Sequence, residues 1–218
     1  MLKFILLLIP IILLSSCEID QDYHFKENGE VDMNINVDMS GFYKSMPPGT
    51  DKKGMGNIKD SINSNIDIQD SLKQYGITKF EMDFDTNTYI LKSDMVFKDL
   101  KYFNSFMNKD RADSLKPIIV EFSSAKFSVK NCASLMSNEL LKGLGNDEPK
   151  PESNLSDDMD MGKFFKFKTT YHFPYKVKNY KSATGKGLLS EDKKSISFEN
   201  SIDEFSDDKF SGDLDVEF

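Results

Sequence analysis

The chain has 218 residues and a formal net charge of −8 at pH 7. Its 28 Lys and Arg residues are interleaved with acids along most of the sequence, which argues against the clustered basic surface that nucleic-acid binding requires. With two His and two Cys residues, the chain offers few of the nitrogen and sulfur ligands that zinc sites use.

Residues 1–16 have the features of a secretory signal peptide. Lys3 precedes an apolar run from Phe4 to Leu14, which contains Pro10 and is followed by two Ser residues. A transmembrane helix needs about 20 apolar residues, and this run is about half as long. We therefore expect residues 1–16 to be removed when the protein is exported.

The sequence Leu-Ser-Ser-Cys at residues 14–17 resembles the lipobox of bacterial lipoproteins. The resemblance implies that Cys17 is acylated and becomes the first residue of the mature protein. Several acyl chains hold a protein on a membrane almost permanently, because each buried CH₂ contributes about 0.8 kcal/mol. Cys17 is therefore the predicted lipidation site, and the membrane is the predicted partner. Glu18 differs from the aspartate that typically retains lipoproteins at an inner membrane, which favours an outer membrane and leaves its periplasmic and outward faces both open.

Removal of residues 1–16 leaves 202 residues (218 − 16) and, because Lys3 is lost, a net charge of −9 (−8 − 1). Residues 17–29 contain Glu18, Asp20 and Asp22, and we expect them to form an acidic tether between the anchor and the fold. Anionic headgroups repel such a segment, so the lipid rather than electrostatic attraction is expected to make the membrane contact.

Alternating apolar and polar residues predict a half-buried strand over residues 30–40. Further along, helical spacing predicts a helix that begins at Asn57 and ends at Gly76, a C′ candidate. Residues 80–84 and 88–97 are then expected to pair as a hairpin.

Asp99 is the expected N-cap of a helix that extends to Met107 or beyond, before Pro117 prevents its continuation. Two short strands are predicted at residues 118–122 and 126–129.

Cys132 is left without a disulfide partner if Cys17 is acylated, so it is either a buried small hydrophobe or a reactive thiol. An apolar helical pattern at residues 133–141 follows it directly, and this favours burial. The core rather than a disulfide is then expected to carry the stability.

Residues 146–160 are rich in Pro, Asn, Ser and acids, and we expect them to form an exposed loop. A calcium site at residues 157–162 is the functional alternative, but the spacing lacks a third Asp or Asn before the Gly and the later Glu of a calcium loop. Strands are predicted at residues 161–173, 195–199 and 214–218.

These segments predict an α+β fold with a mostly antiparallel sheet and two to three packing helices. The expected domains are the signal peptide at residues 1–16, the tether at residues 17–29 and a single ectodomain at residues 30–218. The loop at residues 146–160 is a candidate boundary between two lobes.

The sequence contains no motif that identifies a catalytic, cofactor-binding or metal site. His24 and His172 lack a neighbouring His or a CxxC partner and are expected to be surface or structural residues. The nucleophile motif GxSxG does not occur, and the three SxxK sequences lack their companion motifs. Thr-Gly-Lys-Gly at residues 184–187 is similar to part of a phosphate loop, but the frame lacks the first Gly and the final Ser or Thr, so a strand-to-strand turn is expected.

Several short segments resemble the LppM-like lipoprotein domain, a family found in mycobacteria and scattered through other bacteria. The matching segments are Asn28–Val31, Val37–Ser40, Phe97–Leu100, Phe103–Asn104, Phe173–Val177 and Ser195–Phe198. The chain differs at Tyr175, where the family usually has Gly, and at Phe198, where it frequently has Trp. The resemblance implies a helix-grip-like α+β ectodomain that handles lipids or envelope components, without catalytic residues.

The leading hypothesis is a non-enzymatic envelope lipoprotein, without a cofactor, whose Phe and Met residues enclose a groove for a lipid or another apolar envelope ligand. The same residues are also suited simply to fill a core. The alternative is a structural or interaction lipoprotein held beside an envelope assembly, and a hydrolase that uses carboxylates is the third hypothesis.

Overall fold

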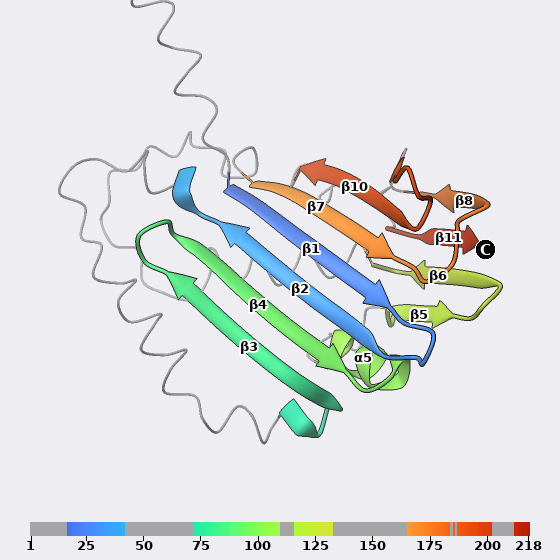
Figure 1. Ribbon diagram of the computed structural model, residues 1–218, viewed down its shortest axis with the longest axis horizontal. Helices are drawn as coiled ribbons and strands as arrows, with labels where there is room; N and C mark the ends of the chain where they lie inside the picture. The colour runs from blue at the N-terminus through green and yellow to red at the C-terminus, as the bar shows by residue number, and fades with distance from the viewer. Residues whose placement is uncertain are drawn as a thin grey trace, which may run out of the picture.

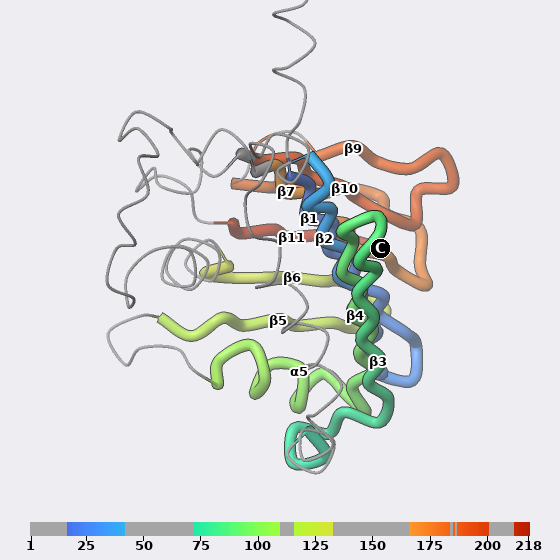
Figure 2. Tube along the Cα trace, turned by 90° about the vertical axis from the view of Figure 1, so that its left-hand side faces the viewer, coloured from blue at the N-terminus to red at the C-terminus, as the bar shows by residue number. Residues whose placement is uncertain are grey.

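The computed structural model describes residues 17–41, 72–109, 116–132, 165–183, 185, 187–201 and 212–218. In this part of the chain, two β-sheets lie one behind the other, with a helix beside the smaller sheet (Figure 1). Viewed from the side, the strands of the smaller sheet run across those of the larger sheet (Figure 2).

The larger sheet, sheet A, has seven strands in the order β3-β4-β2-β1-β7-β10-β9, so β1 is its central strand. Neighbouring strands are antiparallel except β1 and β7, which run parallel. The strands of sheet A are β1 (Cys17–Phe25), β2 (Val31–Asp38), β3 (Ile77–Asp85), β4 (Ile90–Phe97), β7 (Phe165–His172), β9 (Leu188–Leu189) and β10 (Ser195–Ser201).

The smaller sheet, sheet B, has four antiparallel strands in the order β5-β6-β11-β8. Its strands all lie between residues 119 and 217, and the C-terminal strand pairs between two earlier ones. The strands of sheet B are β5 (Ile119–Phe122), β6 (Lys126–Lys130), β8 (Asn179–Ser182) and β11 (Leu214–Glu217).

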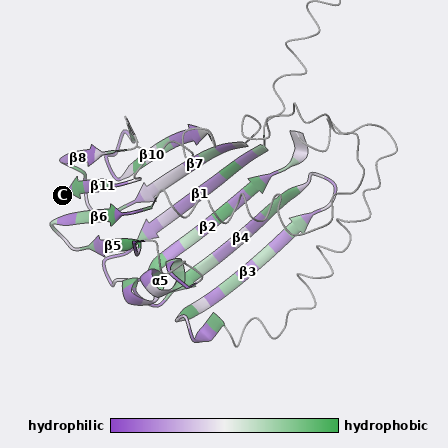
Figure 3. Cartoon of the chain, turned by 180° about the vertical axis from the view of Figure 1, so that it is seen from behind, coloured by the Kyte–Doolittle hydropathy of each residue, from purple (hydrophilic) through white to green (hydrophobic). Residues whose placement is uncertain are grey.

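Residue alternation decides which face of sheet A each side chain occupies. In β2, Val31 and Met33 are buried, whereas Asp32 and Asn34, which alternate with them, are half-buried on the opposite face. Seen from behind, hydrophobic and hydrophilic residues alternate along the strands of this sheet (Figure 3). The apolar face therefore packs towards sheet B, and the other face of sheet A is polar.

The space between the sheets is filled by aromatic side chains that contact one another. The ring centroid of Phe127 lies 4.8 Å from that of Phe25 and 5.0 Å from that of Phe173. Phe97 and Phe103 lie 5.2 Å apart in the same core. These five rings therefore pack together in the core between the two sheets.

Helix α5 (Leu100–Met107) begins as predicted, because the Asp99 carboxylate accepts a hydrogen bond from the backbone N–H of Tyr102. Its side chains also complete the exposed edge of sheet B. Asn104 donates to the carbonyl of Val120 and accepts from the N–H of Val120, each at 2.8 Å. Asn108 makes the same pair of bonds to Ile118, each at 2.8 Å.

The spacing of Asn104 and Asn108 in the helix matches the spacing of alternate residues along the strand. Residues four apart in a helix are about 6 Å apart along its axis, and residues two apart in a strand are separated by about 6.6 Å. Two Asn side chains spaced i, i+4 therefore satisfy alternate backbone groups of the edge strand β5. Because unpaired edges promote unwanted strand association, this arrangement also protects the sheet.

The structure corrects the expected tether. Residues 17–25 form β1, which pairs with β2 on one side and β7 on the other. The acids that suggest a tether lie at alternate positions of β1, and Ile19, Tyr23 and Phe25, at the other set of alternate positions, are buried. The alternating acids of residues 17–25 therefore belong to a half-buried strand and not to an acidic tether.

The predicted fold class is confirmed in its main features, since the described residues form mostly antiparallel sheets with a packing helix. The described part of the chain contains one α-helix, α5, instead of two or three. The other expected helices, at residues 57–76 and 133–141, lie almost entirely outside the described residues.

The segment at residues 146–160 does not separate two independent groups of strands. Strand β7, which follows this segment, lies next to β1 in sheet A, and β11 lies next to β6 in sheet B. The two halves of the chain therefore share both sheets. Among the described residues, no helix has the length and apolar character needed to cross a bilayer.

Candidate functional site

Cys17, the predicted lipidation site, is the first residue of the central strand of sheet A. Its side chain lies on the same face of β1 as Ile19 and Tyr23, and it is 1% exposed. Because protein interiors are close-packed, a side chain buried in this way in the full chain leaves little room for a diacylglyceryl group. The sulfur atom must therefore leave the interior if Cys17 carries a lipid.

The two His residues of the chain lie against each other on the polar face of sheet A. His24 of β1 pairs in register with His172 of β7, and their ring centroids are 4.0 Å apart with an interplanar angle of 3°. The Nε2 atom of His172 lies 3.2 Å from Oδ1 of Asp22. The prediction that both residues are structural or at the surface fits this arrangement, although their contact could not be seen in the sequence.

Burial and the neighbouring His172 ring lower the pKa of His24 from its ordinary value of 6.5. The carboxylates of Asp22 and Asp32 act in the opposite direction, and Lys26 adds to the lowering. The Lys26 ammonium is itself held by the carboxylates of Glu30 and Asp32, and its Nζ lies 2.9 Å from Oδ2 of Asp32. Both the hydrogen bonds and the charges of these two acids raise the pKa of Lys26.

These side chains could suggest a metal site, because imidazole and carboxylate groups are common ligands. In the described part of the chain, however, no three His, Cys, Asp or Glu side chains are placed so that they could hold one ion. The alternative calcium site at residues 157–162 lies outside the described residues.

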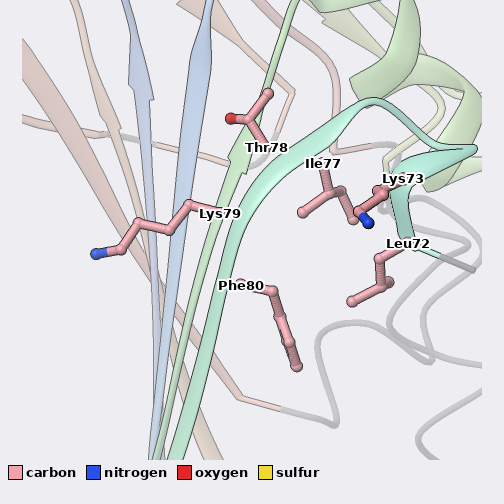
Figure 4. A pocket seen from close by; sticks show the side chains of 6 residues that line it. All are labelled: Leu72, Lys73, Ile77, Thr78, Lys79 and Phe80. Carbon is pink, nitrogen blue, oxygen red and sulfur yellow. The ribbon is translucent and has the colours of Figure 1, made fainter. Parts of the chain in front are cut away.

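A cavity of about 230 Å³ opens beside the edge strand β3. It is lined by the apolar side chains of Leu72, Ile77 and Phe80 together with Lys73, Thr78 and Lys79. The close view shows Lys79 pointing away from the other lining side chains (Figure 4). The cavity thus combines an apolar wall with a cationic side chain, Lys73.

The local shape of this cavity follows from the irregular start of β3. The register against β4 shifts between Ile77 and Lys79, so Thr78 is an extra residue that bonds through its hydroxyl to the carbonyl of Val96. Gly76, just before the strand, has a φ of +64°, which turns the chain into it. Gly76 is predicted as a C′ residue, but no pattern in the residue order indicates a cavity beside it.

Cys132 is half-buried and packs against the core, next to the buried Tyr171. This agrees with the expected burial in direction, although the burial is not complete. Burial is the main cause that raises the pKa of Tyr171 well above its ordinary value, and Cys132 adds to the effect.

The segment that is similar to a phosphate loop links strand β8 of sheet B to strand β9 of sheet A. The hydroxyl of Tyr180 donates to the carbonyl of Gly187 at 2.8 Å. A Cβ atom at Gly187 would lie 2.7 Å from Ile196 and 2.8 Å from Phe198. Packing therefore explains the Gly at this position, and the predicted strand-to-strand connection is confirmed.

No protein-family model matches the chain, and no curated protein matches it by sequence. Among solved structures, the chain is similar to the folded domain of the LppM protein of Mycobacterium tuberculosis, determined by NMR. The match covers 92% of this chain and 88% of that chain, with 9% sequence identity and a TM-score of 0.40. A likeness of this size carries neither a family nor a function over to this chain.

Proposed function

We propose that the protein is a non-enzymatic lipoprotein of the bacterial envelope, anchored to the outer membrane through Cys17. The observation that carries this proposal is the lipobox-like sequence at residues 14–17, directly after a short apolar run. Strand β1, at residues 17–25, lies entirely after the proposed cleavage point.

The anchor requires two covalent changes at Cys17. The thiol loses its proton and forms a thioether bond to the diacylglyceryl group of a phospholipid, whose phosphate-bearing headgroup leaves. Hydrolysis of the peptide bond between Ser16 and Cys17 then releases an α-amino group on Cys17. The acyl chains supply the membrane affinity.

Fractionation of cells that produce the normal protein or the Cys17→Ser variant tests this proposal. We expect the normal protein in the membrane fraction, and also in the detergent phase after phase partition. The variant should lose this membrane association, while Cys132→Ser should keep it. If the Cys17→Ser variant fractionates as the normal protein does, the anchor is not at Cys17.

A second candidate function, binding of an apolar or lipid ligand, is favoured by the cavity beside β3. Leu72, Ile77 and Phe80 offer apolar contacts to such a ligand. The cavity is nevertheless smaller than the 300–1,000 Å³ of typical ligand sites, at about 230 Å³. A ligand that it holds would therefore insert a short apolar segment rather than a whole acyl chain.

Titration with a fluorescent short-chain fatty acid tests the cavity. We expect saturable binding that Phe80→Ser weakens, because this change places a hydroxyl in the apolar wall. The matched control is Leu188→Ser, since Leu188 is 65% exposed on strand β9 and lies outside the cavity lining. Binding that neither change affects would show that the probe occupies another place.

A further inference from the structure

One end of sheet A brings together the start of β1 and several other strand ends, and we call it the Cys17 end. The register pairs Glu18 with Asp38 of β2, and Asp38 with Ile90 of β4. Ile90 pairs in turn with Asp85 of β3, so the turn between β3 and β4 also lies at this end. The backbone N–H of Met39 donates to the carbonyl of Tyr89 at 3.1 Å, which ties this turn to β2.

The opposite end of the sheet contains the turn between β1 and β2, at residues 26–30. The C-terminal residue lies near this end, because the ring of Phe218 lies 5.1 Å from that of Phe173, which follows β7. Figure 1 shows this separation, with the C-terminus far from the start of β1. Nine residues of β1 span about 30 Å between the two ends.

If Cys17 is acylated, only one or two residues would separate the lipid from the first residue that is paired in the sheet. The buried sulfur atom must move outward, which releases Cys17 from the strand. Glu18 or Ile19 then becomes the first residue held in the sheet. One or two extended residues span about 3–7 Å, much less than a tether of 13 residues would allow.

The position of β1 also restricts how far the body can tilt. It is the fourth of seven strands, with three strands on each side of it. When the anchor lies at the middle of a sheet end, tilting in either direction within the sheet plane brings a neighbouring strand end against the bilayer.

We propose that the Cys17 end of sheet A is the membrane-contacting surface and that the turn at residues 26–30 points away from the bilayer. This inference rests on the proposed function, because it assumes the lipid on Cys17. The partner is a bilayer surface with neutral headgroups, since Glu18, Asp38 and Asp85 would repel anionic ones.

The turn between β3 and β4 suits such a contact. The Asp85 carboxylate accepts hydrogen bonds from the backbone N–H groups of Asn87 and Thr88, which lower its pKa. Thr86, Asn87 and Thr88 are exposed and uncharged, and Tyr89 follows them. Tyr is a residue type that is favoured where an apolar and a wet environment meet.

Fluorescence quenching in vesicles tests the orientation. The acylated protein, with Cys132→Ala as a common background, would carry a small fluorophore at Thr86→Cys or at Glu27→Cys. Both positions are exposed turn residues, one at each end of sheet A. In phosphatidylcholine vesicles that contain a nitroxide on the lipid headgroup, we expect the label at residue 86 to lose most of its fluorescence and the label at residue 27 to keep it.

A flexible spacer of about 20 Gly and Ser residues between Cys17 and Glu18 is the matched control, because its average reach is about 25 Å. We expect it to remove most of the quenching at residue 86. Equal quenching at both positions, or stronger quenching at residue 27, would overturn the orientation while leaving the anchor intact. A protein without the acyl mass and without vesicle binding would instead overturn the proposed function.

Hydrogen exchange tests the same surface without fluorophores or substitutions in residues 18–218. The backbone amides of residues 86–89 should exchange more slowly in the vesicle-bound lipoprotein than in the Cys17→Ser form, and those of residues 27–29 should not change. The opposite pattern, or no difference at residues 86–89, would contradict the proposed surface.

Discussion

At the scale of single residues, Gly76 allows the turn before β3 to lie close to helix α5. Its φ is +64°, and a Cβ atom there would lie 2.3 Å from Cγ of Tyr102 on α5. The turn before β3 and the first turn of α5 therefore need a Gly to approach each other. Gly29 also has a positive φ, +86°, but nothing lies within 4 Å of its Cβ position.

Substitution of these two glycines distinguishes the cost of backbone strain from the cost of a steric clash. We expect Gly29→Ala to lower the free energy of unfolding by about 1–2 kcal/mol, the cost of the left-handed backbone conformation alone. Gly76→Ala should cost about 2–4 kcal/mol, because displacement of the Tyr102 ring adds to that strain. Urea denaturation measures both, and equal losses would show that the Tyr102 ring moves aside without cost.

His24 makes a contribution to stability that depends on pH. Its pKa is lowered in the folded protein, so below about 6.5 the unfolded chain binds a proton more readily than the folded chain. The contribution of neutral His24 to the free energy of unfolding is therefore fully present above pH 6.5. It is lost as the pH falls towards the lowered pKa. The neighbours His172, Asp22, Asp32 and Lys26 all contribute to this pKa.

The variant His24→Gln should remove this pH dependence. Between pH 7.5 and 5.5, we expect the normal protein to lose more free energy of unfolding than the variant, because the Asp and Glu residues that also titrate are common to both. Guanidinium denaturation at several pH values measures the difference. Parallel stability curves for the two proteins would contradict this role of His24.

At the scale of secondary structure, the contact between α5 and β5 is the most specific one. Asn104 satisfies both backbone groups of Val120, so Asn104→Ala would leave an N–H and a carbonyl without their partner. We expect a loss of about 1–3 kcal/mol in the free energy of unfolding. The Val120 amide should also exchange its hydrogen faster.

Ser105→Ala is the matched control for this prediction, since Ser105 is exposed on the same helix. It should leave both the stability and the exchange of the Val120 amide nearly unchanged. Unchanged exchange in Asn104→Ala would show that water or another group replaces the Asn side chain at the sheet edge.

Local signals made many of these elements predictable from the sequence. The β3–β4 hairpin follows from alternation around a turn, and α5 follows from the Asp99 cap and its apolar spacing. Strand β1 is not apparent from the sequence because three acids stand among its nine residues, and its parallel partner β7 lies about 150 residues away in the sequence. Strands β8 and β9 are too short to produce a clear pattern.

For the candidate site, the sequence indicates the contiguous motif but not the contacts that depend on strand pairing. Cys17 stays a prediction from the sequence alone, which the contiguous lipobox-like residues 14–17 make possible. The His24–His172 contact and the cavity at Leu72, Ile77 and Phe80 depend on strand pairing and on a shift of register. Such three-dimensional features leave no continuous signal in the residue order.

At the scale of the whole molecule, the proposed anchor on Cys17 would be joined to the fold without a linker. The strand that would carry the lipid is the central strand of sheet A, and its first residue is Cys17. A pull on the acyl chains would therefore act directly on the central strand of the sheet. The opposite end of sheet A, with the C-terminal residue near it, would be the part available to other envelope components.

The mass of the intact protein from the membrane fraction tests the central claim most directly. We predict a polypeptide that begins at Cys17 and carries the added mass of a diacylglyceryl group, with or without a further acyl chain on its amino group. Fragmentation should locate the entire addition on that residue. A membrane-derived protein that retains residues 1–16, or one whose Cys17 has the mass of an unmodified cysteine, would contradict the account.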